Sequence, residues 1–189
     1  MALIDLIFLK IVTPLLHNFY AVARRNMEVS ELESHAMTKL LMVCISNICR
    51  SPMALAVAQR LADEAGHSQK FMFDSAGTHA HHLGERPDPR TQATLIQHGY
   101  EIGRSRSRRI ALQDFHHFDL ILAMDASNLA ELRRVCPPEY AGKLRLLLDF
   151  SDELNASEIP DPYYGNAEGF ERVLTLCEAG TRGLLKHLA

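Results

Sequence analysis

The chain has 189 residues, 47% hydrophobic and 23% charged, which is an ordinary globular composition with enough length for one substantial core. The formal net charge of −3 gives no general electrostatic reason to expect nucleic acid as a partner. The four cysteines, at positions 44, 49, 136 and 177, do not form the dense framework of a secreted disulfide protein, so a reducing cytoplasm is the expected location.

The first 38 residues differ in character from the rest, and we expect an N-terminal extension, helical or disordered, ahead of one domain at 39–189. Residues 1–25 are apolar, but Asp5 and Lys10 interrupt them, so the run is too short for a membrane span. They also lack the basic start and the small-residue cleavage site of a secretory signal. A loose extension or an upstream start codon is the simpler interpretation. The alternative, which we do not favour, is an amphipathic helix that contacts a membrane or a partner.

From Lys39 onward, segments of strand character alternate with segments of helical periodicity. Short apolar runs predict strands at Leu40–Val43, Phe71–Phe73, Leu120–Met124 and Leu144–Leu148. Helical spacing predicts helices at Met53–Gly66, Pro89–His98, Ala126–Val135 and Glu168–Leu188. The alternation predicts an α/β fold with a parallel sheet and helices on both faces, in which ligands bind beyond the carboxyl ends of the strands.

The boundaries between these elements carry their own signals. Ser51 is a favourable N-cap and Pro52 fits the first position of the helix that follows it. Residues 74–78 (D-S-A-G-T) are expected to leave the second strand as a loop. Residues 151–166 are expected to form the loop that precedes the last helix.

The segment V-C-I-S-N-I-C-R-S-P, residues 43–52, lies at a strand end and leads into a helix. Such a turn presents unpaired backbone N–H groups, which together with the helix dipole form an anion site. The Walker pattern is absent, and instead Cys44 and Arg50 are separated by five residues. A chain folded around a tetrahedral anion would place the thiol beneath it. The guanidinium, which binds two phosphate oxygens at once, would lie beside it.

The same surroundings favour the thiolate of Cys44, which would be a nucleophile next to a bound phosphoryl group. Ser51 could donate its hydroxyl to that sulfur, and Asn47 suits an unusual backbone angle in the turn. Asp161 lies between two prolines in I-P-D-P-Y-Y-G, so its backbone is stiff. With aromatic residues next to it, Asp161 is a candidate general acid for the leaving oxygen, and its carboxylate could then activate water.

These residues together resemble the low-molecular-weight protein tyrosine phosphatases. The resemblance rests on C-I-S-N-I-C-R-S-P-M-A from Cys44, D-P-Y-Y from Asp161, and shorter segments in family order that begin at Ser75, Asp88 and Asp119. It covers Lys39 to Leu188. It implies a three-layer, flavodoxin-like α/β fold with a four-stranded parallel sheet, and a two-step reaction without metal or other cofactor. It also implies phosphotyrosine protein substrates, with phosphate as product and inhibitor.

By similarity, Cys44 is expected to be the nucleophile, Arg50 the phosphate clamp and Asp161 the proton donor. Asn47, Ser51 and Ser75 would form the hydrogen-bond network that shapes the loop. Cys49 would be a reversible disulfide partner of Cys44, which would spare the nucleophile from irreversible oxidation. The positions expected to contact substrate are Ile45, Ser46, Asn47, Ile48, Cys49, Ser51, His81, Tyr163 and Tyr164.

Three positions depart from the family pattern. Ser46 stands where glycine is usual, and it would be strained there if its φ angle is positive. Ser105 stands where some relatives carry a histidine that supports the loop asparagine. His81 stands at a wall position that often carries Trp or Tyr, and its ring stacks less broadly, so substrate preference is open.

Other activities stay open on the same fold. Arsenate reductases need a further cysteine pair, whereas Cys136 and Cys177 each fit an apolar helix or its end. A relative that acts on phosphoarginine tends to carry Thr where Ile48 stands, so Ile48 favours phosphotyrosine. The histidines at 79, 81, 82, 116 and 117 suit a solvated surface better than a metal site. The arginines at 104, 106, 108 and 109 are interpreted as a solvated cluster, with steering of anionic substrates as the alternative.

Overall fold

The computed structural model describes residues 37–151 and 156–188. The expected N-terminal extension, including any membrane contact of residues 1–25, lies outside the described residues apart from its last two positions, and it stays a prediction. The described strands are β1 (Thr38–Cys44), β2 (Phe71–Gly77), β3 (Leu120–Ala123) and β4 (Leu144–Leu146). The α-helices are α2 (Arg50–Glu64), α3 (Pro89–Gln97), α4 (Leu112–His117), α5 (Ala126–Val135) and α6 (Ala167–Leu188). Two short 3₁₀ helices, η1 (Pro138–Lys143) and η2 (Leu147–Phe150), flank β4.

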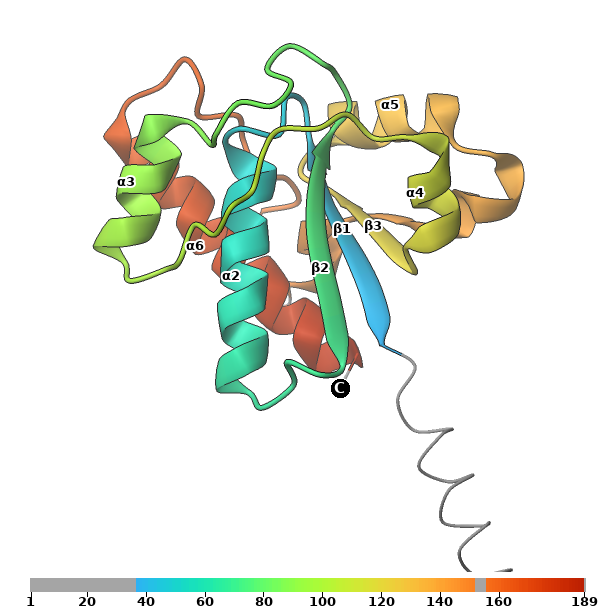
Figure 1. The fold of residues 1–189 in the computed structure, drawn as a ribbon, viewed down its shortest axis with the longest axis horizontal. Coiled ribbons are helices and arrows are strands. Elements are labelled where there is room, and N and C mark those ends of the chain that lie inside the picture. The colour runs from blue at the N-terminus through green and yellow to red at the C-terminus, as the bar shows by residue number, and fades with distance from the viewer. Residues whose placement is uncertain (1–36, 152–155, 189) are drawn as a thin grey trace, which may run out of the picture. The chain divides into compact units, whose positions relative to one another are not determined.

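The strands form one parallel sheet in the order β2-β1-β3-β4, which is the middle of three layers (Figure 1). Leu40 and Met42 of β1 belong to the core shared with α2 and α6, whereas Leu41 and Val43 belong to the core under α4 and α5. This follows from the two-residue period of a strand, and burial on both faces explains why β1 is apolar throughout. The predicted fold class is therefore confirmed.

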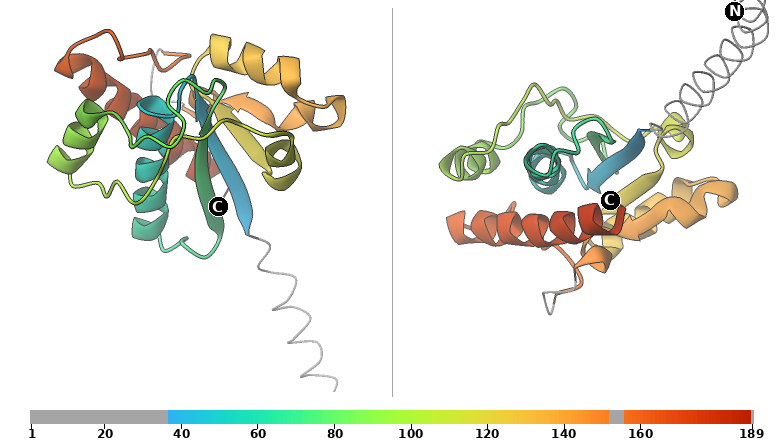
Figure 2. Two further views of the ribbon diagram at one scale, coloured as in Figure 1. Left: turned by 45° about the horizontal axis from the view of Figure 1, so that its top comes forward. Right: turned by 90° about the horizontal axis from the view of Figure 1, so that it is seen from below.

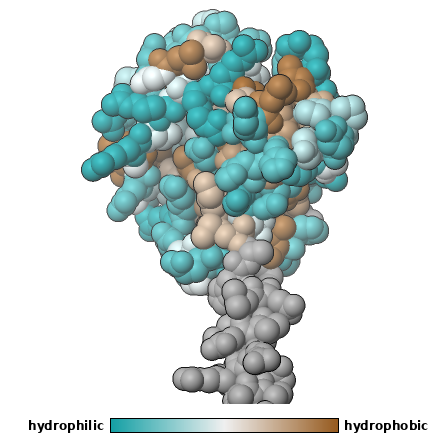
Figure 3. Space-filling model, turned by 45° about the vertical axis from the view of Figure 1, so that its right-hand side comes forward, coloured by the Kyte–Doolittle hydropathy of each residue, from teal (hydrophilic) through white to brown (hydrophobic). Residues whose placement is uncertain are grey.

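The layer that contains α2 is held together by the last helix of the chain. With 22 residues, α6 is the longest described helix, and the right view of Figure 2 shows it at full length along one side of the sheet. Its buried stripe includes Phe170, Val173 and Leu184, and it packs on α2, α3 and η2. Among the helices between residues 37 and 188, none is long and apolar enough to cross a membrane. Figure 3 shows one face of the molecule, which is mainly hydrophilic with small separate groups of hydrophobic residues.

Two strands end more than one residue away from the position that the sequence predicts. β2 does not end at Phe73 but continues through Gly77, because Ser75 and Ala76 pair with β1 at Met42 and Val43. Residues of turn-forming type therefore lie in a strand here, since the ladder with a central strand outweighs their local preference. The fourth predicted strand also ends early, because Leu147 and Leu148 belong to η2.

The start of α2 also corrects the prediction. The helix begins at Arg50, and Cys49 occupies the N-cap position without a side-chain hydrogen bond. Ser51 is therefore not the N-cap but lies in the first turn, where its hydroxyl turns toward the loop. Gly66 after α2 and Gly99 after α3 have φ angles of 71° and 75°, the left-handed conformation in which glycine ends a helix.

The sheet topology explains why loops from distant parts of the sequence meet. The chain adds β2 to one side of β1 and then β3 to the other side, so the carboxyl ends of β1 and β3 flank a topological switch point. Backbone bonds extend this edge, from Met124 N–H to the Val43 carbonyl at 3.2 Å and from Ile159 N–H to the Met124 carbonyl at 2.8 Å. The segment around Asp161 is thereby brought to the loop that follows β1.

Candidate active site

The loop between β1 and α2, residues 45–49, curls at the carboxyl edge of the sheet. Asn47 has a φ angle of 56°, the one positive value among the described non-glycine residues. Asparagine tolerates this left-handed conformation better than most residues, as the sequence suggested. Ser46 has no positive φ angle, so the serine in place of the usual glycine causes no backbone strain.

Backbone N–H groups of neighbouring segments donate hydrogen bonds to the carbonyl oxygens of the loop. The carbonyls of Cys44, Ile45 and Ile48 accept backbone hydrogen bonds at 2.8 to 2.9 Å from residues 78, 79 and 88. The backbone N–H groups of residues 45–49 donate to no residue that the structure describes. Backbone N–H groups that lie at the start of a helix and have no hydrogen-bond acceptor are suited to bind an anion.

A buried side-chain network sets the shape of this loop. The Asn47 amide nitrogen Nδ2 donates to Ser51 Oγ at 2.9 Å and to Ser75 Oγ at 2.8 Å. Its oxygen Oδ1 accepts from the backbone N–H of Arg108 at 3.0 Å. Ser105, at the position where some relatives have a supporting histidine, makes no hydrogen bond to Asn47. The support comes instead from the Arg108 backbone.

Cys44 lies at the floor of the loop with its sulfur 3.1 Å from Ser51 Oγ. The thiol opens into a cavity of about 360 Å³. The cavity is lined by Cys44, Ile45, Ser46, Ile48, Cys49, Arg50, His81, His82, Asp161, Tyr163 and Tyr164. Asn47 and Ser51, which were expected among the substrate contacts, are buried beneath the loop and do not line the cavity. His82 lines it although the sequence did not single it out for this role.

Arg50 is the charged group at the base of the cavity, and its side chain is 1% exposed. Nη2 lies 2.6 Å from Asp161 Oδ2, and Nη1 pairs with Asp125 Oδ2 and donates to the Ile159 carbonyl at 3.1 Å. Burial alone would lower the pKa of Arg50, but the acidic groups of Cys44, Asp161 and Asp125 raise it above its usual value. The guanidinium therefore keeps its positive charge.

Asp125 is a site residue that the sequence interpretation missed. Its Oδ2 holds Arg50, while its Oδ1 accepts from Asn128 N–H at 2.6 Å and caps α5. One carboxylate thus joins the start of α5 to the base of the cavity. The available signal was an acidic N-cap immediately after a buried strand, at the switch point of the sheet.

Arg90 fixes the outer wall of the cavity and was also missed. Its side chain pairs with Asp88 at 2.8 Å and donates to the Tyr163 carbonyl at 2.9 Å. The guanidinium also lies over the Phe170 ring, 4.7 Å from its centroid. Asp88 N–H in turn bonds the Ile48 carbonyl at 2.8 Å. The start of α3 therefore connects the loop of residues 45–49, which we call the anion loop, to the segment that carries Asp161.

The remaining cysteines differ from Cys44 in their surroundings. Burial, with nearby Asp88 and Cys44, raises the pKa of the Cys49 thiol to about 12. Burial also raises the pKa of Cys177, which is fully enclosed under the sheet. Cys136 is partly buried, and its thiol donates to the Pro137 carbonyl at 3.3 Å. Among the described residues, no three His, Cys, Asp or Glu side chains gather as metal ligands.

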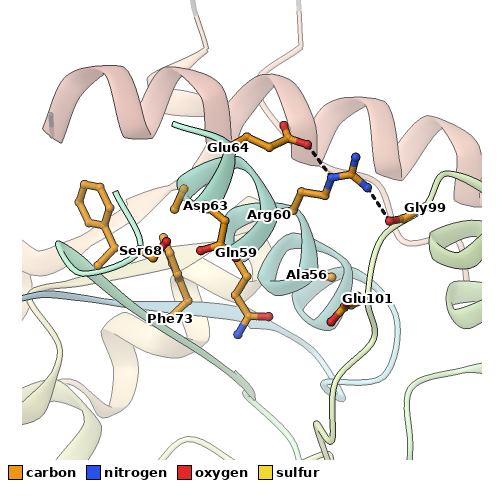
Figure 4. A pocket seen from close by; sticks show the side chains of 11 residues that line it. Ala56, Gln59, Arg60, Asp63, Glu64, Ser68, Phe73, Gly99 and Glu101 are labelled. Atoms are coloured by element: carbon orange, nitrogen blue, oxygen red, sulfur yellow. Dashed lines mark hydrogen bonds and ion pairs between the residues drawn. The ribbon is translucent and has the colours of Figure 1, made fainter. Parts of the chain in front are cut away.

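A larger cavity, of about 590 Å³, lies on the outer side of α2 (Figure 4). Arg60 crosses it between Glu64 and the Gly99 carbonyl, and Ser68 and Phe73 form part of its wall. It includes Phe71, at the amino-terminal start of β2, so it lies away from the carboxyl ends of the strands. No thiol lines it. The smaller cavity is therefore the candidate active site.

Known proteins share both this sequence and this fold. The family described as low molecular weight phosphotyrosine protein phosphatase matches residues 39–189. A low molecular weight protein-tyrosine-phosphatase of Streptomyces coelicolor is 44% identical over 146 residues, which are 76% of this chain and 88% of the relative.

Solved structures agree with the sequence match. A protein tyrosine phosphatase from Entamoeba histolytica, with Hepes in its active site, has a TM-score of 0.78 at 40% identity. The match covers 80% of this chain and 96% of that one. A drosophila arginine phosphatase has a TM-score of 0.74 at 35% identity, over 80% and 98% of the two chains.

Proposed function

The chain belongs to the low molecular weight phosphotyrosine protein phosphatase family, and on this premise we propose that it hydrolyses phosphotyrosine in proteins and small aryl phosphates. One structural observation supports this activity independently of the family match. Cys44, Arg50 and Asp161 line a single cavity at the topological switch point of the sheet. A nucleophile, an anion clamp and a proton donor are the three groups that the reaction needs.

In the first step, the Cys44 thiolate attacks phosphorus while the bond from phosphorus to the aryl oxygen breaks. The loop amides and Arg50 hold the three equatorial oxygens and stabilise their charge in the transition state. Asp161 gives its proton to the departing phenol oxygen. The products of this step are the free tyrosine side chain and a phosphate bonded to the Cys44 sulfur.

In the second step, water attacks the phosphorus and the sulfur–phosphorus bond breaks. The Asp161 carboxylate, now without its proton, accepts one from the attacking water. Ser51 Oγ, 3.1 Å from Cys44 Sγ, donates a hydrogen bond that stabilises the sulfur as it leaves as thiolate. Inorganic phosphate is the product, and because it occupies the same amides and guanidinium, it competes with substrate.

The walls of the cavity support an aromatic substrate. Tyr163, Tyr164, His81 and His82 line it, and the rings of His82 and Tyr163 are neighbours, with centroids 6.3 Å apart. Ile48 adds an apolar surface without a hydroxyl, which favours an aryl ring over the polar guanidino group of phosphoarginine. The structural likeness to an arginine phosphatase makes phosphoarginine the second candidate substrate. Arsenate reduction is disfavoured, because Cys177 is fully buried on α6 and Cys136 follows α5.

The second thiol of the loop supports a protective role. Cys49 lines the same cavity as Cys44, so we propose that the two form a reversible disulfide under peroxide. Catalysis requires both to be reduced, which agrees with the cytoplasmic location expected from the sequence.

The direct test is turnover of p-nitrophenyl phosphate and a phosphotyrosine peptide, measured beside a phosphoarginine peptide and arsenate with thioredoxin. We expect rapid release of phosphate from the first two substrates. Cys44→Ser should abolish turnover and retain phosphate binding, because the amides and Arg50 remain. Faster cleavage of phosphoarginine, or thioredoxin-dependent arsenate reduction alone, would replace the proposal by one of its rivals.

A further inference from the structure

Two loops beside the cavity carry an excess of positive charge that the chemistry does not use. Residues 79–90 and 101–110 contain six arginines against three carboxylates, in a chain whose formal net charge is −3. Two of these arginines have structural roles: Arg90 is paired with Asp88, and Arg108 with Asp74 and Asp114. Arg109 lines a separate cavity together with Glu131.

The three remaining arginines are Arg86, Arg104 and Arg106, which we call the basic rim. All three side chains are exposed, and none forms an ion pair with a carboxylate in the part of the chain that the structure describes. Glu85, next to Arg86, is engaged by His82 at 2.9 Å, and Glu101, three residues before Arg104, forms no ion pair with any residue that the structure describes. The guanidinium groups of the rim are therefore free to bind carboxylates of another molecule.

The basic rim is attached directly to the wall of the active site. Gly84 N–H bonds the Ser107 carbonyl at 2.8 Å, and Ser107 N–H bonds the Glu85 carbonyl at 2.9 Å, so the two loops are paired. Ser107 Oγ donates to the Ser46 carbonyl at 2.8 Å, and Ser46 lines the cavity. Arg106 Nη1 reaches the Gly84 carbonyl at 3.5 Å. Arg106 is thus one residue from a direct contact with the anion loop.

We propose that the basic rim binds aspartate and glutamate side chains that flank phosphotyrosine in the substrate protein, so that the enzyme prefers acidic phosphorylation sites. This inference rests on the proposed phosphatase activity. The cavity has room for the phosphate and its ring, and it is lined by His81, His82 and Ser46, which belong to or contact the two loops of the rim. The residues that flank phosphotyrosine would therefore lie outside the cavity, near these loops. Exposed guanidinium groups there can form bidentate pairs with carboxylates without the cost of burying either charge.

The test compares two phosphotyrosine peptides that differ only at the flanking positions, Asp and Glu in one and Asn and Gln in the other. The rim variant is Arg86→Gln/Arg104→Gln/Arg106→Gln. Its matched control is Lys70→Gln/Arg133→Gln/Lys186→Gln, which removes the same net charge from exposed positions remote from the cavity. Each protein is also assayed with p-nitrophenyl phosphate, which has no flanking residues.

The wild-type chain should show a kcat/KM on the order of tenfold higher for the acidic peptide, since each exposed pair contributes a factor of a few. The rim variant should lose this preference, and the control variant should keep it. About 0.5 M salt should reduce it, because exposed charges are then screened. Turnover of p-nitrophenyl phosphate should be equal in all three proteins.

Equal rates for the two peptides in the wild-type chain would overturn the inference, as would a preference that survives in the rim variant. Loss of the preference in the control variant as well would also overturn it, because overall charge would then be the cause. Failure to hydrolyse p-nitrophenyl phosphate and both peptides would instead refute the proposed function. If the rim variant loses the preference, a second variant with Glu at all three rim positions provides a further test. It should prefer peptides in which lysine flanks phosphotyrosine.

Discussion

Arg50 Nη2 lies 2.6 Å from Asp161 Oδ2, so the group expected to clamp phosphate and the group expected to protonate the leaving oxygen are in direct contact. The two residues are 111 positions apart in the sequence. Their contact places the carboxyl beside the position of a bound phosphoryl group. It also means that Asp161 competes with phosphate for one nitrogen of the guanidinium.

Asp161→Asn should therefore separate catalysis from binding. We expect kcat for phenyl phosphate to fall by roughly 10²–10⁴-fold, the usual contribution of general acid catalysis. The fall should be smaller for p-nitrophenyl phosphate, whose leaving group needs less protonation. Inorganic phosphate should inhibit the variant at least as strongly as the wild type, because a competing carboxylate is gone. Steady-state kinetics with both esters measure this, and an unchanged kcat for phenyl phosphate would remove Asp161 from the mechanism.

Asp125 has two contacts that substitution can separate. Asp125→Asn keeps an N-cap for α5 but removes the charge that holds Arg50, so kcat/KM should fall by about 10²-fold with little loss of stability. Asp125→Ala should show the same fall in activity and a further loss of about 1 kcal/mol in the free energy of unfolding. Kinetics and urea unfolding of both variants provide the test. Equal stability of the two would show that the cap contributes nothing.

Cys49 should contribute to the loss of folding stability at alkaline pH. Its pKa is raised from 9.0 to about 12 in the folded chain, so above pH 9 the unfolded chain loses a proton that the folded chain keeps. The contribution of Cys49 is complete below that pH and is lost as pH rises toward 12. Cys49→Ala should therefore flatten the decline in unfolding midpoint above pH 9. Parallel curves for variant and wild type would contradict this, although Tyr100 and Cys177 keep part of the slope in both.

Gly183 marks the closest approach of α6 to the segment after β4. A Cβ atom at this position would overlap the Phe150 carbonyl oxygen, so Gly183→Ala should destabilise the fold by about 1–3 kcal/mol or more. Gly142→Ala is the matched control, because nothing lies within 4 Å of the Cβ it would add. Its effect should stay within about 0.5 kcal/mol. Thermal or urea unfolding measures both, and similar midpoints would mean that α6 shifts without cost.

The sequence could predict the elements whose signal is local. The four strands are apolar runs, and α5 has the predicted bounds, Ala126–Val135. By contrast, α4 has six residues, too few to show a helical period, and it was not predicted. The second half of β2 was missed because its stability comes from pairing with β1 and not from Asp74, Ser75 and Gly77 themselves.

The same division applies to the candidate site. Cys44, Asn47 and Arg50 lie within seven consecutive residues, so their spacing and their place between a strand and a helix were visible in the sequence. Asp125 and Arg90 meet the loop only through the topology of the sheet. Asp125 lies 75 positions from the arginine that it holds, and spacing alone cannot reveal such a pair. The interpretation of residues 104–109 as a solvated cluster does not hold for Arg108, which pairs with Asp74 and Asp114.

Residues 106–108 are adjacent in the sequence but have different roles. Ser107 and the backbone of Arg108 brace the anion loop, while the Arg106 side chain is exposed. Substitutions of Arg106 can therefore occur without disturbing the contacts that hold the anion loop. Descendants of one ancestral gene are then free to acquire new protein targets while they inherit the same chemistry unchanged.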